Sequence, residues 1–134
     1  MANAMFDPGR EGFLDGSIDW DTNDQRVMLA KSAYSFNAAH KFVSELSTLA
    51  DNGRSAALSG KGVTNGVADA AGTTLTVTSA VACNALIVYQ YNASDTAARL
   101  IAYIDGVSGL PMTPAASATV SITWGTDENK MFKL

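Results

Sequence analysis

Two short apolar stretches, separated by a polar loop, constrain most strongly how this chain of 134 residues can fold. Residues 85–91 (ALIVYQY) and 99–105 (RLIAYID) are apolar at successive positions, a pattern typical of strands that are covered on both faces. Residues 92–98 between them have the length and polarity of a hairpin loop. We therefore expect two antiparallel neighbours at the centre of a sheet, with a second sheet, a helix or a partner subunit over each face.

Turn signals divide much of the remaining chain into further short strands. Glycines and Asn-Gly pairs recur from Asn52 onward and supply the backbone freedom that tight reversals need. Four further segments have the apolar pattern of strands: 25–31, 74–78, 118–124 and 131–134. About six or seven strands at this spacing predict a mainly β chain, an antiparallel β-sandwich or barrel-like sheet with one or two short peripheral helices.

The N-terminal part of the chain carries helical signals. Over residues 7–15 we expect a short helix with Asp7 as its N-cap, Pro8 in the first helical position and Gly16 just past its end. Two internal glycines lower the intrinsic stability of this helix. Residues 1–20 are therefore predicted to form an N-terminal helical arm.

A second helix is predicted over residues 38–49. Phe42, Leu46 and Leu49 recur there at spacings of four and three, and Val43 widens the stripe. This spacing produces one apolar face that can lie against a sheet.

Composition narrows the class of protein. With 47% apolar and 16% charged residues the chain can bury enough surface to fold, and we expect a single domain over residues 1–134 with a β-rich core over 25–134. The net charge of -4 argues against nucleic acid as a partner, because such a partner needs a basic face. No apolar stretch reaches the roughly 18–20 residues of a membrane span, and the N-terminus (MANAMFDP) lacks the pattern of a signal peptide. We therefore expect no membrane partner and no cleaved signal.

The sequence shows no recognisable catalytic or metal-binding pattern. The single histidine, His40, has no nucleophile or carboxylate pair at a supporting spacing, so a helix-start or packing role is favoured over catalysis. The single cysteine, Cys83, fits a small thiol packed near the start of a strand. Capping and turn formation explain the acidic run 15–24 better than calcium binding does, because its spacing departs from that of a calcium loop. We therefore expect no enzyme activity, no cofactor and no metal.

Aromatic side chains beside polar loops leave two roles open. Trp20, Tyr34 and Phe36 flank such loops and belong either to the core, which is favoured, or to a binding surface. The low charge content suggests a surface that is partly covered in an oligomer or a larger assembly.

Five segments, spread over nearly the whole chain, are similar to segments of a known protein family. They are GREGFLDGSIDW (9–20), RVML (26–29), RLIAYIDGVSGLPMTP (99–114), VSITW (120–124) and KMFKL (130–134). This pattern resembles a family of small tailed-bacteriophage virion proteins. The resemblance implies a structural protein of the phage particle, a capsid decoration (cement) protein on the head surface that bridges major capsid subunits. It further implies the major capsid protein as partner, a homotrimer, and assembly in the host cytoplasm.

Docking on the capsid is expected through the N-terminal segment, because short apolar arms at the end of a small domain are natural docking elements. The candidate interface residues are Met5, Phe6, Phe13, Leu14 and Trp20. A tail-, neck- or fibre-associated structural protein is the alternative, and a ligand-binding or enzymatic domain is the third possibility. Copy number in the particle separates the first two, and a pocket with converging polar groups would favour the third.

Overall fold

The computed structural model describes residues 4–46, 50–105, 109–124 and 131–133. It is mainly β, as predicted, with antiparallel sheets, the α-helix α1 (Asp7–Asp15) and the 3₁₀ helix η1 (Val43–Leu46). The strands are β1 (Ala4–Met5), β2 (Gln25–Lys31), β3 (Asp51–Arg54), β4 (Gly62–Thr64), β5 (Val67–Asp69), β6 (Thr73–Thr76), β7 (Cys83–Gln90), β8 (Arg99–Ile104), β9 (Thr119–Ile122) and β10 (Phe132–Lys133). Among these described residues no helix is both long enough and apolar enough to span a membrane.

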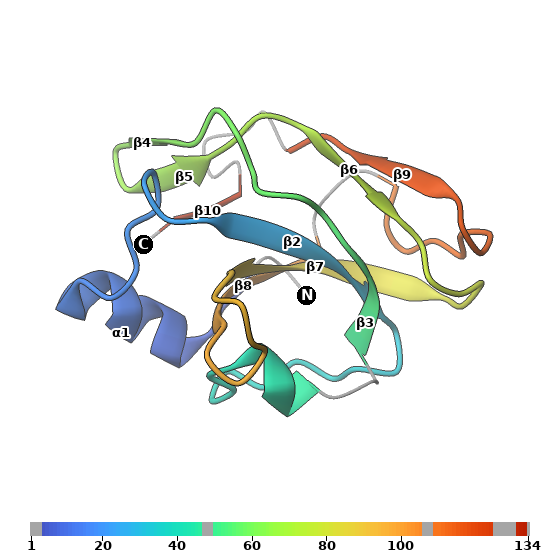
Figure 1. Cartoon of the computed structure of the whole chain (residues 1–134), viewed down its shortest axis with the longest axis horizontal. Helices are drawn as coiled ribbons and strands as arrows, with labels where there is room; N and C mark the ends of the chain where they lie inside the picture. The colour runs from blue at the N-terminus through green and yellow to red at the C-terminus, as the bar shows by residue number, and fades with distance from the viewer. Residues whose placement is uncertain (1–3, 47–49, 106–108, 125–130, 134) are drawn as a thin grey trace.

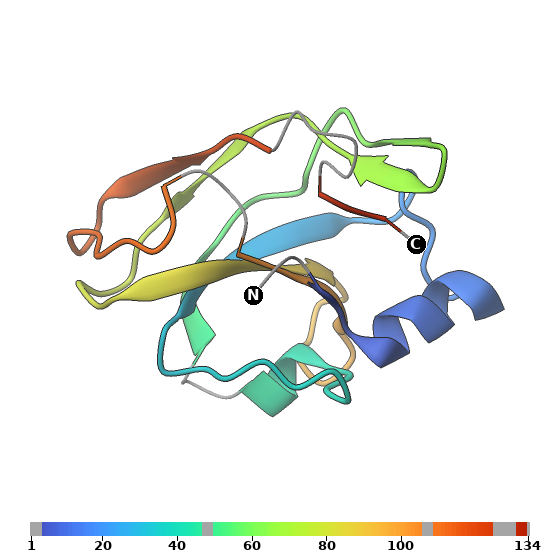
Figure 2. The same ribbon diagram turned by 180° about the vertical axis from the view of Figure 1, so that it is seen from behind.

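The strands are arranged in layers. The largest sheet has the order β1-β8-β7-β2-β3, a smaller sheet has the order β10-β5-β4, and β6 pairs with β9. The two smaller sheets lie over one face of the largest sheet, and the chain around η1 lies across its other face (Figure 1). Figure 2 shows the same layers from behind, with α1 at one side of the largest sheet. The architecture is therefore sandwich-like, with an additional cover on the second face.

The central hairpin is covered on both faces, as predicted. Strands β7 and β8 pair antiparallel, with Val88 opposite Ala102. Along β7, Leu86 and Val88 belong to the core beneath the small sheets, whereas Ile87 and Tyr89 belong to the core beneath the chain around η1. Successive side chains therefore enter different cores, which explains why this segment is apolar without alternation.

The prediction of a helix over residues 38–49 is wrong. In the described part of that range, the only helical element is the short η1. Residues 47–49 lie outside the described residues. The Val43 N–H donates to the carbonyl of Ala98 at the end of the β7–β8 loop (3.0 Å). A donor used by another segment cannot continue a helical ladder, so long-range bonding outweighs the local helical pattern. Val43 and Leu46 are still buried, so the apolar stripe packs without a full helix.

Helix α1 has its predicted bounds but a different N-cap. Phe6, rather than Asp7, occupies the capping position, and no side chain caps the helix. Phe6 is held there because its N–H donates to the Ile101 carbonyl of β8 (3.0 Å), so the helix begins directly where β1 ends. Gly16 terminates the helix as predicted, with a φ of 83° in the left-handed region.

Gly9 allows α1 to lie directly on β8. A Cβ atom at this position would be 2.8 Å from the carbonyl oxygens of Leu100 and Ile101. Real side chains do not tolerate such an approach to backbone, so packing requires the glycine that weakens the isolated helix.

Within the predicted N-terminal arm, residues 4–6 are part of the largest sheet and of its two cores. Strand β1 pairs with β8, with Met5 opposite Ala102. Met5 and Phe6 are buried in the two different cores, one on each face of the largest sheet. Their side chains are covered by the chain itself, which corrects the expectation that they form a docking surface.

The remaining predicted strands lie close to their expected positions. Strand β2 has the predicted bounds, and β6 pairs with β9 so that Leu75 is opposite Val120. Ile122 of β9 is buried whereas Thr119 and Ser121 are exposed, as the alternation predicts. Strand β10 pairs with β5, so the described C-terminal residues lie beside a strand from the middle of the sequence.

Candidate functional site: an apolar pocket

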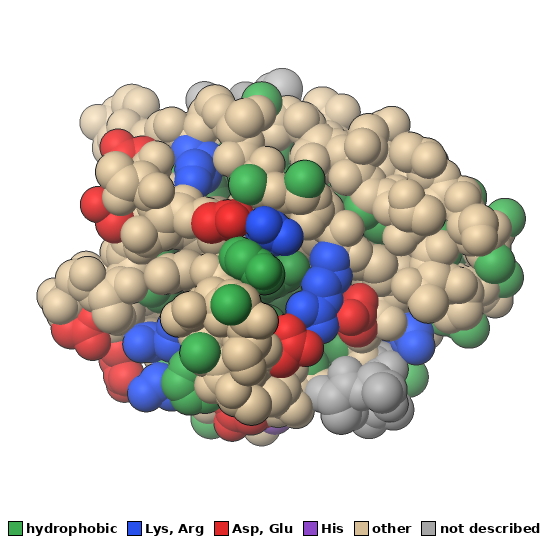
Figure 3. Space-filling model, in the orientation of Figure 1, with side chains coloured by type: hydrophobic (Ala, Val, Ile, Leu, Met, Phe, Trp, Pro, Cys, Tyr) green, Lys and Arg blue, Asp and Glu red, His purple; other side chains and the backbone are tan. Residues whose placement is uncertain are grey.

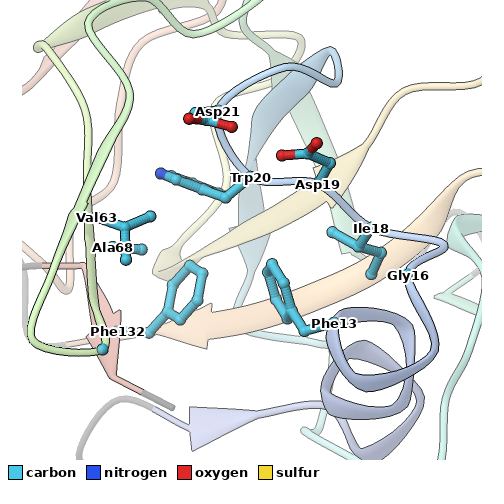
Figure 4. A pocket seen from close by; sticks show the side chains of 10 residues that line it. Phe13, Gly16, Ile18, Asp19, Trp20, Asp21, Val63, Ala68 and Phe132 are labelled. Carbon is cyan, nitrogen blue, oxygen red and sulfur yellow. The ribbon is translucent and has the colours of Figure 1, made fainter.

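An apolar pocket lies where α1, the loop that follows it and the β10-β5-β4 sheet meet. Its volume is about 350 Å³. Figure 4 shows the rings of Phe13 and Phe132 side by side, with Trp20 and two aspartates beyond them. The residues that define it are Phe13, Ile18, Trp20, Val63, Ala68 and Phe132 in its walls and Asp19 and Asp21 at its rim.

Three aromatic rings from distant parts of the chain form one side of the pocket. The ring centroid of Phe132 lies 5.2 Å from that of Trp20 and 6.0 Å from that of Phe13. The Trp20 Nε1–H donates to the carbonyl oxygen of Asp69 at the end of β5 (3.2 Å). Trp20 and Phe132 are buried, whereas Phe13 is half-buried. The first two rings are therefore a fixed wall, and Phe13 is the more accessible ring.

Local hydrogen bonds stabilise the loop after α1, which contains the rim residues Asp19 and Asp21. The Asp15 carboxylate accepts bonds from the N–H and the hydroxyl of Ser17 (2.9 and 2.6 Å), and these bonds lower the pKa of Asp15. The Asn23 side-chain oxygen accepts the Asp19 N–H (2.8 Å), and Gln25 Nε2 donates to the Asp19 carbonyl (3.1 Å). The acidic run therefore forms turn contacts, as predicted, but no side-chain cap of α1.

Negative charge gathers at the rim. Asp19 and Asp21 are exposed there, and residues 15–24 contain no Lys or Arg, although the Lys61 ammonium donates to the Asn23 carbonyl of this loop. Figure 3 shows acidic side chains, with basic ones among them, on the side of the molecule where α1 and β4 lie. Hydrogen bonding, first of all with the Thr22 side chain, lowers the pKa of Asp19. Asp19 is therefore a carboxylate at neutral pH, at the mouth of a pocket with apolar walls.

The structure separates the five predicted interface residues into three groups. Phe13 and Trp20 come together in the pocket, although Trp20 is only 4% exposed. Leu14 lies on α1 outside the pocket lining and is 87% exposed. Met5 and Phe6 are buried elsewhere, in the cores of the large sheet.

Three residues of the pocket were not predicted from the sequence: Val63, Ala68 and Phe132. Phe132 lies in the predicted closing strand, and its pairing with Ala68 brings it to the pocket. Val63 lies in β4 opposite Ala68 and is 58% exposed. No local signal relates these residues to α1, because their proximity depends on how β10 and β5 pair.

The other residues considered for chemistry lie in the cores or contact residues that do. The Tyr34 hydroxyl lies 2.9 Å from His40 Nδ1, and burial raises the pKa of Tyr34 to about 12. Tyr34 belongs to the core, whereas Phe36 is partly buried against it. Cys83 is a buried free thiol at the start of β7, as predicted. Among the described residues no three His, Cys, Asp or Glu side chains lie close enough to hold a metal ion.

No protein-family model, curated protein or solved structure matches this chain. The resemblance to phage virion proteins therefore stays a prediction.

Proposed function

We propose that this chain is a structural protein of a tailed-phage virion that decorates the outside of the head and bridges major capsid subunits. The resemblance of its segments to small virion proteins supports this proposal. The structural observation that carries it is the apolar pocket, whose walls include the exposed side chain of Val63. Exposed apolar side chains around a pocket are typical of surfaces that bind another protein.

Leu14 and Phe13 are the N-terminal side chains that a capsid subunit can reach. Both lie on α1, and Leu14 is largely exposed. Removal of residues 1–14 would also remove Met5 and Phe6 from the two cores. Point substitutions on the surface therefore test docking more cleanly than a deletion does.

Bridging explains how a small protein of this kind would stabilise a capsid. A protein that contacts two subunits makes the loss of either subunit also a loss of its own contacts. Many copies, arranged as homotrimers, would add modest interfaces into a large effect on the lattice.

The test is the amount and the position of the chain in purified particles of the phage that encodes it. We expect many copies relative to the major capsid protein by quantitative mass spectrometry, and retention on heads after the tails are removed. Few copies, found only with tails, would identify the tail-associated alternative, and absence from particles would contradict the proposal.

Surface variants locate the contact. We expect Leu14→Ser and Val63→Thr to reduce binding to heads that lack the protein by about tenfold or more, as loss of apolar anchors does. Val81→Ser is the matched control, because Val81 is also exposed (38%) but lies neither on α1 nor in the pocket lining. Equal binding by all three variants would place the interface elsewhere.

A ligand-binding module is the second candidate, and the pocket favours it specifically. Its volume lies at the lower end of the roughly 300–1,000 Å³ of small-ligand sites, and carboxylates stand at its rim. Titration of the labelled chain with neutral monosaccharides and disaccharides, followed by NMR, tests this candidate. Saturable shifts at Phe13 and Trp20, together with absence from particles, would favour it over the virion role.

A further inference from the structure

We propose that the pocket receives a large apolar side chain from a protein segment that carries Lys or Arg next to that side chain. This inference rests on the proposed function only in naming a capsid subunit as the source of the segment. The chemistry of the segment is argued from the walls and the rim of the pocket.

The walls favour an apolar occupant. Phe13, Ile18 and Phe132 offer only carbon atoms from their side chains. The indole N–H of Trp20 is a polar group of the walls, but it is already bonded to the Asp69 carbonyl. A polar side chain that entered the pocket would lose its water without finding this donor, whereas an apolar side chain would gain from leaving water.

The rim favours basic neighbours. No ion pair joins Asp19 or Asp21 to a Lys or Arg within the described part of the chain. Arg26 close by is paired with Asp24 (3.0 Å). Both carboxylates are exposed and therefore able to contact a cation of a partner.

Nearby cations are also committed to the protein's own backbone. Arg99 Nη2 donates to the Pro8 carbonyl (2.6 Å), and the Lys61 ammonium donates to the Asn23 carbonyl. These bonds hold both cations on the loop and the helix. Both cations keep their charge, but neither forms an ion pair with Asp19 or Asp21, so a basic segment of a partner can contact these carboxylates directly. Attraction between opposite charges would speed the encounter.

The arrangement of walls and rim sets the pattern that the pocket recognises. The apolar walls are contiguous, and Figure 4 shows both aspartates on the same side, beyond the rings. A bound chain that inserts one side chain therefore brings the adjacent residues to the carboxylates. An apolar residue with basic neighbours satisfies both features at once.

The test uses three fluorescent heptapeptides, GKKFKKG, GEEFEEG and GKKAKKG, titrated into the full chain. We expect the first to bind about tenfold or more tightly than either of the others, because only it matches both walls and rim. Its affinity should fall as salt rises, since Debye screening weakens exposed charge pairs. NMR shifts should appear at the Trp20 indole N–H and the Phe13 ring.

Charge variants test whether the carboxylates at the rim bind the basic residues of the peptide. We expect Asp19→Asn with Asp21→Asn to weaken binding of GKKFKKG about threefold to tenfold, the range of two exposed ion pairs. Asp7→Asn is the matched control and should leave binding unchanged, because Asp7 is an exposed carboxylate at the other end of α1. An amide NMR spectrum of each variant verifies that the fold is intact.

The outcomes distinguish this inference from the proposed function. Equal binding of the acidic and basic peptides, or shifts away from the pocket, would overturn the inference even if the chain is abundant on heads. Selective binding of GKKFKKG by a chain that is absent from particles would overturn the virion role and leave the pocket as a docking site. Binding of a sugar at the same residues with no peptide binding would also overturn the inference.

Discussion

The indole ring of Trp20 meets the ring of Phe132 edge-on, with an angle of 87° between the planes and 5.2 Å between the centroids. Trp20 lies in the loop after α1, and Phe132 lies in the last described strand. Edge-to-face pairs of this kind add to the stability that area burial provides. The contact joins segments from the two ends of the chain, so the pocket exists only in the complete fold.

Loss of the Phe132 ring is expected to destabilise the protein and to open the pocket. Phe132→Ala should lower the free energy of unfolding by about 3–5 kcal/mol, because a buried aromatic side chain is removed and a cavity remains. Urea unfolding measures this change, and a red shift of tryptophan emission reports the exposure of Trp20. Val81→Ala at an exposed site should change stability by less than about 0.5 kcal/mol. A similar effect of both substitutions would contradict the role of the ring.

The close approach of Gly9 to β8 predicts that a better helix former will destabilise the protein. Gly9→Ala should raise helix propensity by about 1 kcal/mol but produce a net loss of about 1–3 kcal/mol, because the new Cβ collides with two backbone carbonyls. Thermal and urea unfolding measure the net effect. Glu11→Ala, at an exposed position of the same helix, is the control and should be nearly neutral. A Gly9→Ala protein more stable than the natural chain would refute the packing argument.

The ion pair between Arg54 and Asp95 predicts a defined pH dependence. Two bonds of 2.7 and 2.9 Å join the side chains, and hydrogen bonding with Arg54 lowers the pKa of Asp95. The stabilisation is therefore present above the unfolded pKa of about 3.9 and is lost as pH falls through the lower folded pKa. We expect Asp95→Asn to cost about 0.5–1 kcal/mol at pH 7, the range of a partly exposed pair, and less at pH 2.5.

A double-mutant cycle separates this pair from general effects of the substitution. In an Arg54→Gln background, Asp95→Asn should have little effect on the free energy of unfolding at pH 7, because the partner charge is already absent. A cost of Asp95→Asn that is the same at both pH values, or the same in both backgrounds, would exclude the ion pair as its cause.

Asn52 is expected to protect the thiol of Cys83. The buried Asn52 amide contacts Cys83 Sγ (3.1 Å) and also bonds to Ser79. Burial raises the pKa of Cys83, so a thiol reagent at pH 8 should react roughly a hundredfold or more slowly with the native than with the unfolded chain. Asn52→Ala should cost about 1–3 kcal/mol and accelerate the reaction, because the fold opens more often. This effect should outweigh the loss of the Asn52 hydrogen bond, which by itself lowers the pKa of Cys83. Asn92→Ala at an exposed site should change neither stability nor reaction rate. Rapid modification of the native chain would contradict this protection.

Much of the fold could be predicted because strand signals are local. The hairpin of β7 and β8, the bounds of β2 and α1, and the end of the helix at Gly16 all follow from neighbouring residues and turn chemistry. The region around η1 could not be predicted, because the Val43 N–H bonds to Ala98 in a distant loop. A helical stripe in the sequence does not reveal that its backbone donors are used elsewhere.

The candidate site could be predicted only in part. Phe13 and Trp20 stand out as apolar residues beside an acidic loop, whereas Met5 and Phe6 have the same character but enter the cores. The hydrophobicity of a side chain indicates that it will be buried. It does not indicate whether the same chain or a partner protein buries it.

By itself, the sequence determined the β-rich class, the central hairpin and the acidic turn after α1, because each depends on interactions between residues close along the chain. Only the tertiary structure decided that Phe132 completes a pocket with Trp20 and that β1 joins the large sheet. The physical reason is that strand pairing brings together residues whose separation along the chain leaves no periodic pattern.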